Sequence, residues 1–129
     1  MKKICAAAVL AAAVLALAAP GALAQLSNAE VKERLAYQKI ENARFLIGVN
    51  KFHEAREELT DILLDTSLSD EVRGNALMQK GNIGMRTSDY KAAESDYLAV
   101  LQLPGASEKL KNAAKQGADF ASSFANLRK

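Results

Sequence analysis

The residues best suited to chemistry lie between positions 53 and 65. The run H-E-A-R-E at 53–57 resembles part of a zinc-protease signature, in which two histidines on one helix face hold the metal. Glu57 stands where the second histidine is needed, so the run predicts no catalytic zinc site. Carboxylates also recur at helical spacing along this stretch, at Glu54, Glu58, Asp61 and Asp65. Hard cations take oxygen ligands, so a metal-binding acidic helix is an alternative to the favoured interpretation, a solvated outer face.

No other catalytic set emerges from the sequence. His53 is the only histidine, so no Ser/His/Asp arrangement is indicated, and the chain has no glycine-rich phosphate loop. The only cysteine, Cys5, falls in the first 24 residues. We therefore expect no catalytic residues, no metal and no cofactor, which predicts that the protein is not an enzyme.

The first 24 of the 129 residues form a separate segment that is typical of an export signal. Two lysines precede an apolar stretch over 4–19, Pro20 and Gly21 interrupt it, and Ala22-Leu23-Ala24 fits a cleavage site. We expect a signal peptide at 1–24, cleavage after Ala24 and a periplasmic protein. The alternative is an uncleaved inner-membrane anchor. Cleavage lowers the formal net charge from +2 to zero, which favours neither nucleic acid nor a membrane as a partner of residues 25–129.

Residues 25–129 are predicted to form about five helices and no strand. Prolines occur only at positions 20 and 104, so none interrupts a helix before Leu103. Ser27-Asn28-Ala29-Glu30 fits a capping box, and Ser69 can cap a later helix. Helical spacing of apolar residues and turn signals place helices at about 28–48, 53–65, 70–86, 90–102 and 107–127. The predicted fold class is all-α.

The last predicted helix carries an apolar face and a polar face. The apolar face is expected to contain Leu110, Ala113, Gly117, Phe120, Phe124 and Leu127. Lys109, Lys111, Lys115 and Asp119 form the opposite polar side, which is typical of a helix that caps a repeat array. The alternative is that the apolar face mates with a second copy of the chain.

A helix–turn–helix unit occurs twice with an offset of 38 residues. Ala43 aligns with Gly81, Phe52 with Tyr90, and Ala55 with Ala93. The small residues would let the two helices of a pair approach closely, and the aromatic residues would fill the turn between them. The sequence therefore predicts a short array of stacked helix pairs.

These residues resemble the tetratricopeptide repeat family. The match is better over 74–107, through Leu77, Gly81, Tyr90, Ala93, Tyr97, Leu101 and Pro104, and weaker over 36–66. The resemblance implies antiparallel helix–turn–helix pairs stacked as a short solenoid within a helical domain at 25–129, with a C-terminal capping helix at 107–127. It indicates a fold more strongly than a function.

In that family the first helix of each pair lines a concave groove. Carried over by position, the resemblance gives these groove candidates: Tyr37, Ile40, Arg44, Ile47, Asn75, Met78, Asn82, Met85 and Arg86. Residues 53–72 carry a net charge of −6 and residues 73–91 a net charge of +3, so the groove is expected to be mildly basic. The predicted function is a periplasmic adaptor or scaffold that binds a segment of another protein or peptide. The alternatives are a self-associating module that uses the last helix and, more weakly, a metal-binding protein that uses the acidic helix.

Overall fold

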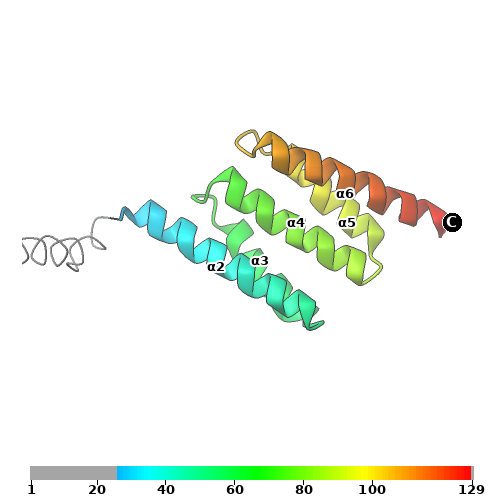
Figure 1. The fold of residues 1–129 in the computed structure, drawn as a ribbon, viewed down its shortest axis with the longest axis horizontal. Helices are drawn as coiled ribbons and strands as arrows, with labels where there is room; N and C mark the ends of the chain where they lie inside the picture. Colours follow the sequence, from blue (N-terminus) through cyan, green and yellow to red (C-terminus); the bar gives the residue numbers. More distant parts are fainter. Residues whose placement is uncertain (1–25, 129) are drawn as a thin grey trace, which may run out of the picture. The chain divides into compact units, whose positions relative to one another are not determined.

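The computed structural model describes residues 26–128, which form five helices (Figure 1). They are α2 (Asn28–Gly48), α3 (Phe52–Leu64), α4 (Asp70–Arg86), α5 (Tyr90–Leu101) and α6 (Glu108–Leu127). No strand occurs within 26–128, and the all-α prediction is confirmed. None of the described helices combines the length and the apolar character needed to cross a membrane. The predicted signal peptide and its cleavage site lie outside the described residues.

The predicted capping box opens α2. Glu30 Oε2 accepts hydrogen bonds from the Ser27 backbone N–H at 2.8 Å and from Ser27 Oγ at 3.1 Å. In return, Ser27 Oγ accepts from the Glu30 N–H at 3.2 Å. This reciprocal arrangement satisfies N–H groups that an α-helix leaves without partners in its first turn.

Residues 32–128 contain two antiparallel helix pairs, the first of which includes the rest of α2, followed by a single helix. The pairs are α2–α3 and α4–α5, and each is joined by a three-residue turn. In Figure 1, α4 lies between α2 and α6, and α5 packs behind α4 and α6. Each turn contains a residue with positive φ, Asn50 at 63° and Ser88 at 61°, again separated by 38 positions.

The core follows the two pairs. The first pair packs against α4 through aliphatic side chains, of which Ile40, Leu59, Ile62, Val72 and Ile83 are almost completely buried. The second pair packs against α6 through Tyr97 and small residues, with one further cluster of alanine, leucine and valine side chains. The apolar faces of neighbouring helices therefore cover one another along the array.

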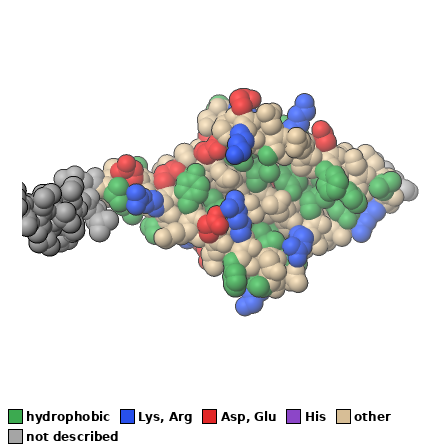
Figure 2. Space-filling view, viewed as in Figure 1, with side chains coloured by type: hydrophobic (Ala, Val, Ile, Leu, Met, Phe, Trp, Pro, Cys, Tyr) green, Lys and Arg blue, Asp and Glu red, His purple; other side chains and the backbone are tan. Residues whose placement is uncertain are grey.

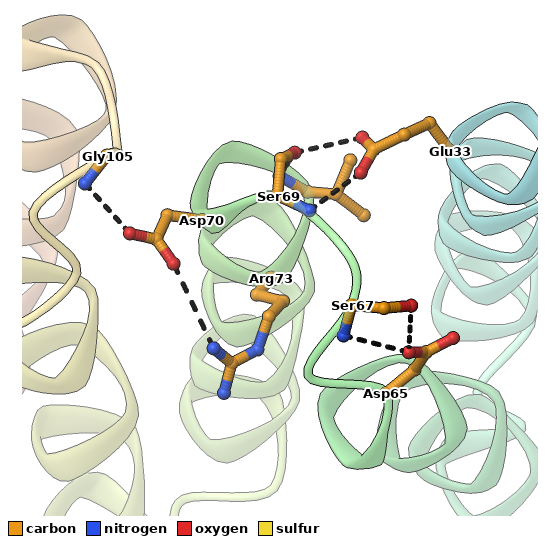
Figure 3. Close-up of polar contacts among 8 residues, drawn as sticks. Glu33, Asp65, Ser67, Ser69, Asp70, Arg73 and Gly105 are labelled. Carbon is orange, nitrogen blue, oxygen red and sulfur yellow. Dashed lines mark hydrogen bonds and ion pairs between the residues drawn. The ribbon is translucent and has the colours of Figure 1, made fainter. Parts of the chain in front are cut away.

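The 38-residue offset also appears in the contacts between successive pairs, of which Figure 3 shows the first, between Glu33 and Ser69. Glu33 accepts from the backbone N–H of Ser69 at 2.6 Å and from its Oγ at 2.9 Å. Glu71 accepts from the N–H of Ser107 at 2.7 Å and from its Oγ at 3.0 Å. Both serines are helix N-caps, of α4 and α6 respectively. Glu33 of α2 thus fixes the start of α4, and Glu71 of α4 fixes the start of α6 in the same way.

This equivalence makes α6 the counterpart of α4. The two helices begin 38 positions apart, at Asp70 and Glu108. Positions 78 and 81 of α4 correspond to Gln116 and Asp119 of α6, which are exposed and polar. The side of α6 that would receive another helix is therefore polar.

The predicted apolar face of the last helix requires a correction. The residues that α6 buries are Leu110, Ala114, Ala118 and Ala121, whereas Ala113 is exposed and Phe120 is 59% exposed. The small alanine side chains let α6 lie close to α5, and the bulkier phenylalanines are displaced to one flank.

Candidate protein-interaction surface

Six residues at corresponding positions of α2, α4 and α6, all exposed or partly buried, define what we term the front face. Its residues fall into two rows with the 38-residue offset. The first row is Tyr37, Asn75 and Ala113, and the second row is Arg44, Asn82 and Phe120. The three helices thus present corresponding positions side by side, and the front face is a composite of all of them.

The predicted groove residues differ in exposure. Tyr37, Arg44 and Arg86 are exposed, whereas four others are partly buried: Asn75, Met78, Asn82 and Met85. Ile40 and Ile47 are 1% and 7% exposed and belong to the core of the first pair. The prediction that they line the groove is therefore wrong, because the helix pair closes over them.

The two asparagines of α4 already make internal hydrogen bonds. Asn82 Oδ1 accepts from the Tyr97 hydroxyl at 2.8 Å, and Asn82 Nδ2 donates to Gln79 Oε1 at 3.3 Å. Asn75 Nδ2 donates to the Glu71 backbone carbonyl at 2.9 Å. Asn82 therefore ties the front face to α5, and contact with a peptide backbone through its amide would require these bonds to be exchanged.

The arginines on this side of the molecule also have partners. Arg44 Nη1 lies 2.6 Å from Glu41 Oε1. Arg86 Nη2 donates to Asn50 Oδ1 at 2.8 Å, and its guanidinium carbon lies 5.7 Å from the centre of the Phe52 ring. Arg86 therefore braces the turn of the preceding pair and has a neutral hydrogen-bond partner.

Tyr37 keeps its hydroxyl protonated at neutral pH. Partial burial raises the pKa of this hydroxyl above its ordinary value, and the negative charges of Glu71 and Glu33 raise it further. The hydroxyl is accordingly a hydrogen-bond donor on the exposed surface.

An aromatic patch lies at one end of the front face, and it contains Phe120, Phe124 and Leu127, which the sequence had assigned to an apolar face that caps the array or mates with a second copy. We define the patch as Tyr90, Phe120, Phe124 and Leu127 with Arg128 at its edge. Figure 2 shows hydrophobic side chains gathered over the C-terminal half of α6. The alanine spacing at 114, 118 and 121 was the signal available in the sequence for a different buried face.

The patch is a continuous cluster of rings, in which Phe124 stacks on Tyr90 and meets Phe120 edge to face. The Phe124 ring lies 5.2 Å from that of Tyr90 and 4.8 Å from that of Phe120, between ring centres. The Arg128 guanidinium carbon lies 5.1 Å from the Tyr90 ring centre, in the same cluster. Phe120 and Leu127 remain 59% and 80% exposed. The cluster holds large apolar side chains at the surface instead of in the core.

The carboxylates of the acidic helix, α3, are not gathered into a cluster of possible metal ligands. Within the described residues, no group of three or more His, Cys, Asp or Glu side chains is placed to hold a metal ion. Two of its carboxylates contact α2, since Asp61 lies 3.2 Å from Lys39 Nζ and Glu58 accepts from Asn42 at 3.1 Å. The His53 side chain is 85% exposed, and its Nε2 lies 3.4 Å from Glu57 Oε1.

A shallow cavity of about 200 Å³ opens between α2 and α3. Apolar side chains including Leu35, Ile62 and Leu68 line it, and two ion pairs, Lys32–Asp65 and Lys39–Asp61, flank it. The Asp65 carboxylate accepts from the hydroxyl and backbone N–H of Ser67, and these bonds lower the pKa of Asp65.

Comparison of the chain with protein-family models, curated proteins and solved structures finds no match.

Proposed function

We propose that this chain is a non-enzymatic protein-interaction adaptor that binds a segment of a partner protein on its front face. The observation that carries this proposal is the exposure of two large aromatic residues, Tyr37 on α2 and Phe120 on α6, outside the buried core. Exposed apolar patches commonly mark binding sites, and aromatic residues and arginine are enriched at interfaces.

The resemblance to tetratricopeptide repeats supports the same surface, since the first helices of the pairs line the groove in that family. The predicted signal peptide places the adaptor in the periplasm, where it would serve envelope assembly, secretion or maturation of an enzyme complex. In this proposal the partner is another protein or peptide, and the chain binds no nucleic acid, membrane or cofactor.

Photo-crosslinking from defined positions tests this proposal. A photoreactive phenylalanine analogue is introduced at Asn75 or Phe120 on the front face, and at Thr60 on α3 as the matched exposed control. We expect discrete crosslinked partner bands from the two front-face positions and none from Thr60. Equal crosslinking from all three positions, or from Thr60 alone, would contradict the assignment of the surface.

Self-association is a second candidate function, favoured by the 59% and 80% exposure of Phe120 and Leu127. Light scattering on the purified protein distinguishes it from the first. A dimer that Phe120→Ser converts to a monomer would support self-association, whereas a protein that is already monomeric at high concentration would exclude it.

A further inference from the structure

We propose that the partner segment is an acidic amphipathic helix whose apolar side docks on the aromatic patch; this inference rests on the proposed function. It follows from the shape of the patch, from the distribution of charge beside it, and from the all-helical character of the front face.

The patch supplies an apolar surface that is already held in place. Phe124 is fixed between Tyr90 and Phe120 by ring contacts of 5.2 and 4.8 Å, so docking need not first order these side chains. Preorganised aromatic residues give contact area at little cost in conformational entropy. Such a surface suits the apolar side of a partner.

Three carboxylates of α2 and α4 are committed to internal contacts. Glu33 and Glu71 each accept two hydrogen bonds from a serine N-cap. Glu41 pairs with Arg44 at 2.6 Å. These acids are therefore already engaged within the chain.

Two arginines at the C-terminal ends of α4 and α6 have only neutral partners among residues 26–128. Arg86 donates to Asn50 Oδ1, and Arg128 Nη1 donates to the Ser88 backbone carbonyl at 3.5 Å. Neither forms an ion pair with a carboxylate of residues 26–128. The nearby Asp89 side chain caps α5 by accepting from the Ala92 N–H. The cations at this end are thus available to carboxylates of a partner, and a guanidinium binds a carboxylate well.

The helical form of the partner follows from what the front face offers. The described residues contain no strand edge, so a partner cannot add a strand to a sheet here. Recognition must use side chains, and an amphipathic helix presents apolar and acidic side chains on adjoining faces. Its apolar side would contact the rings and its carboxylates would reach Arg86 and Arg128.

Binding of two labelled synthetic peptides, measured by fluorescence anisotropy on the purified protein, tests this inference. The peptides are roughly five helical turns long and share leucine and phenylalanine on one side. One carries glutamate on its other side and the second carries lysine. We expect the glutamate peptide to bind at least about tenfold more tightly than the lysine peptide, because Arg86 and Arg128 attract only the first.

Matched variants locate the binding. Phe120→Ser should weaken binding of the glutamate peptide about tenfold or more, whereas Phe45→Ser, which alters a 67% exposed phenylalanine of α2, should leave it unchanged. Arg86→Gln with Arg128→Gln should remove the preference for the glutamate peptide, and Arg34→Gln with Arg56→Gln should retain it. Circular dichroism confirms that each variant remains helical.

Several outcomes would overturn the inference. They are equal binding of the two peptides, equal losses from Phe45→Ser and Phe120→Ser, and a dimer that Phe120→Ser dissolves while neither peptide binds. If crosslinking from Asn75 still captures a discrete partner in any of these cases, the adaptor function stands and only the acidic helix is rejected. Absence of front-face crosslinks would reject the adaptor function itself.

Discussion

The first helix pair is packed with branched aliphatic side chains, whereas the second pair combines glycines with a tyrosine. Position 43 is Ala and its counterpart at 81 is Gly, while Leu59 corresponds to Tyr97. A Cβ atom added at Gly81 would overlap the Tyr97 ring. The helix pair that recurs every 38 residues can therefore fill its interior in two ways. In both, a larger residue on one helix faces a smaller residue on the other.

The largest expected effect comes from introducing the alanine of the first pair, Ala43, at the corresponding position 81 of the second pair. Gly81→Ala should destabilise the protein by about 1–3 kcal/mol, because the new methyl group collides with Tyr97. Adding Tyr97→Leu, which recreates the Ala43–Leu59 combination, should recover part of the loss. Urea denaturation measures both variants.

Gly48→Ala is the matched control, since a Cβ atom there meets nothing within 4 Å. It should be neutral or slightly stabilising. Strictly additive effects of Gly81→Ala and Tyr97→Leu would show that the two sites are not coupled.

The equivalent serine N-caps should have similar effects in both halves. Ser69→Ala and Ser107→Ala should each lower the free energy of unfolding by about 1–2 kcal/mol, because each removes a helix cap and a hydrogen bond to a glutamate. Thermal unfolding compares them with Ser95→Ala, an exposed serine of α5. A loss confined to one of the two caps would break the equivalence of the pairs.

Polar residues that line the cavity between α2 and α3 should be replaceable by the residues at the corresponding positions of the second pair. Positions 39 and 61 correspond to Leu77 and Ala99, and Leu77 packs on the core of the second pair. Lys39→Leu with Asp61→Ala should leave stability unchanged or raise it by up to about 1 kcal/mol, because an exposed ion pair contributes little. Chemical denaturation measures the change. A loss of more than about 1 kcal/mol in the free energy of unfolding would mean that the Lys39–Asp61 ion pair contributes substantially to the stability of the first pair.

The smallest effect concerns Asp96 of α5, which is largely covered in the second pair and lies 3.7 Å from Lys80 Nζ. Burial raises the pKa of the Asp96 carboxyl, and the charges of Lys80 and Arg56 oppose this rise. The resulting contribution to stability is complete below the ordinary pKa of 3.8 and is lost as the pH rises through the raised value.

Asp96→Asn should therefore be at least as stable as the parent protein at pH 7, by no more than about 1 kcal/mol, and the difference should shrink as the pH falls toward 4. Thermal unfolding at both pH values measures it. A variant that is clearly less stable at pH 7 would show that the Lys80 ion pair outweighs the cost of burial.

Local signals were sufficient to predict the helices. The Ser27 capping box, the Ser69 cap and the turn residues placed the helix ends within about two residues of those observed. The 38-residue offset was also visible, because the same residue types recur in both pairs. These features depend on neighbours in sequence, so they can be inferred without tertiary structure.

The candidate surface was predicted less completely. Tyr37 and Arg44 are exposed as expected, but periodicity alone did not distinguish the core position Ile47 from its surface neighbours. In the last helix, Phe120 and Phe124 led us to predict that their side is buried. The side that α6 buries carries alanines instead, because their small side chains allow close approach to α5. Which apolar side is covered depends on the neighbouring helix, and that information is not local.

The equivalent Glu–Ser contacts also bear on how the chain folds. Within residues 32–128, the side-chain hydrogen bonds join residues that are at most 40 positions apart in sequence. Low contact order favours rapid folding, and a linear array can open from one end while the other remains closed. The aromatic patch occupies such an end, so a partner docked there would suppress fraying of the terminal helix and slow the opening of the second pair.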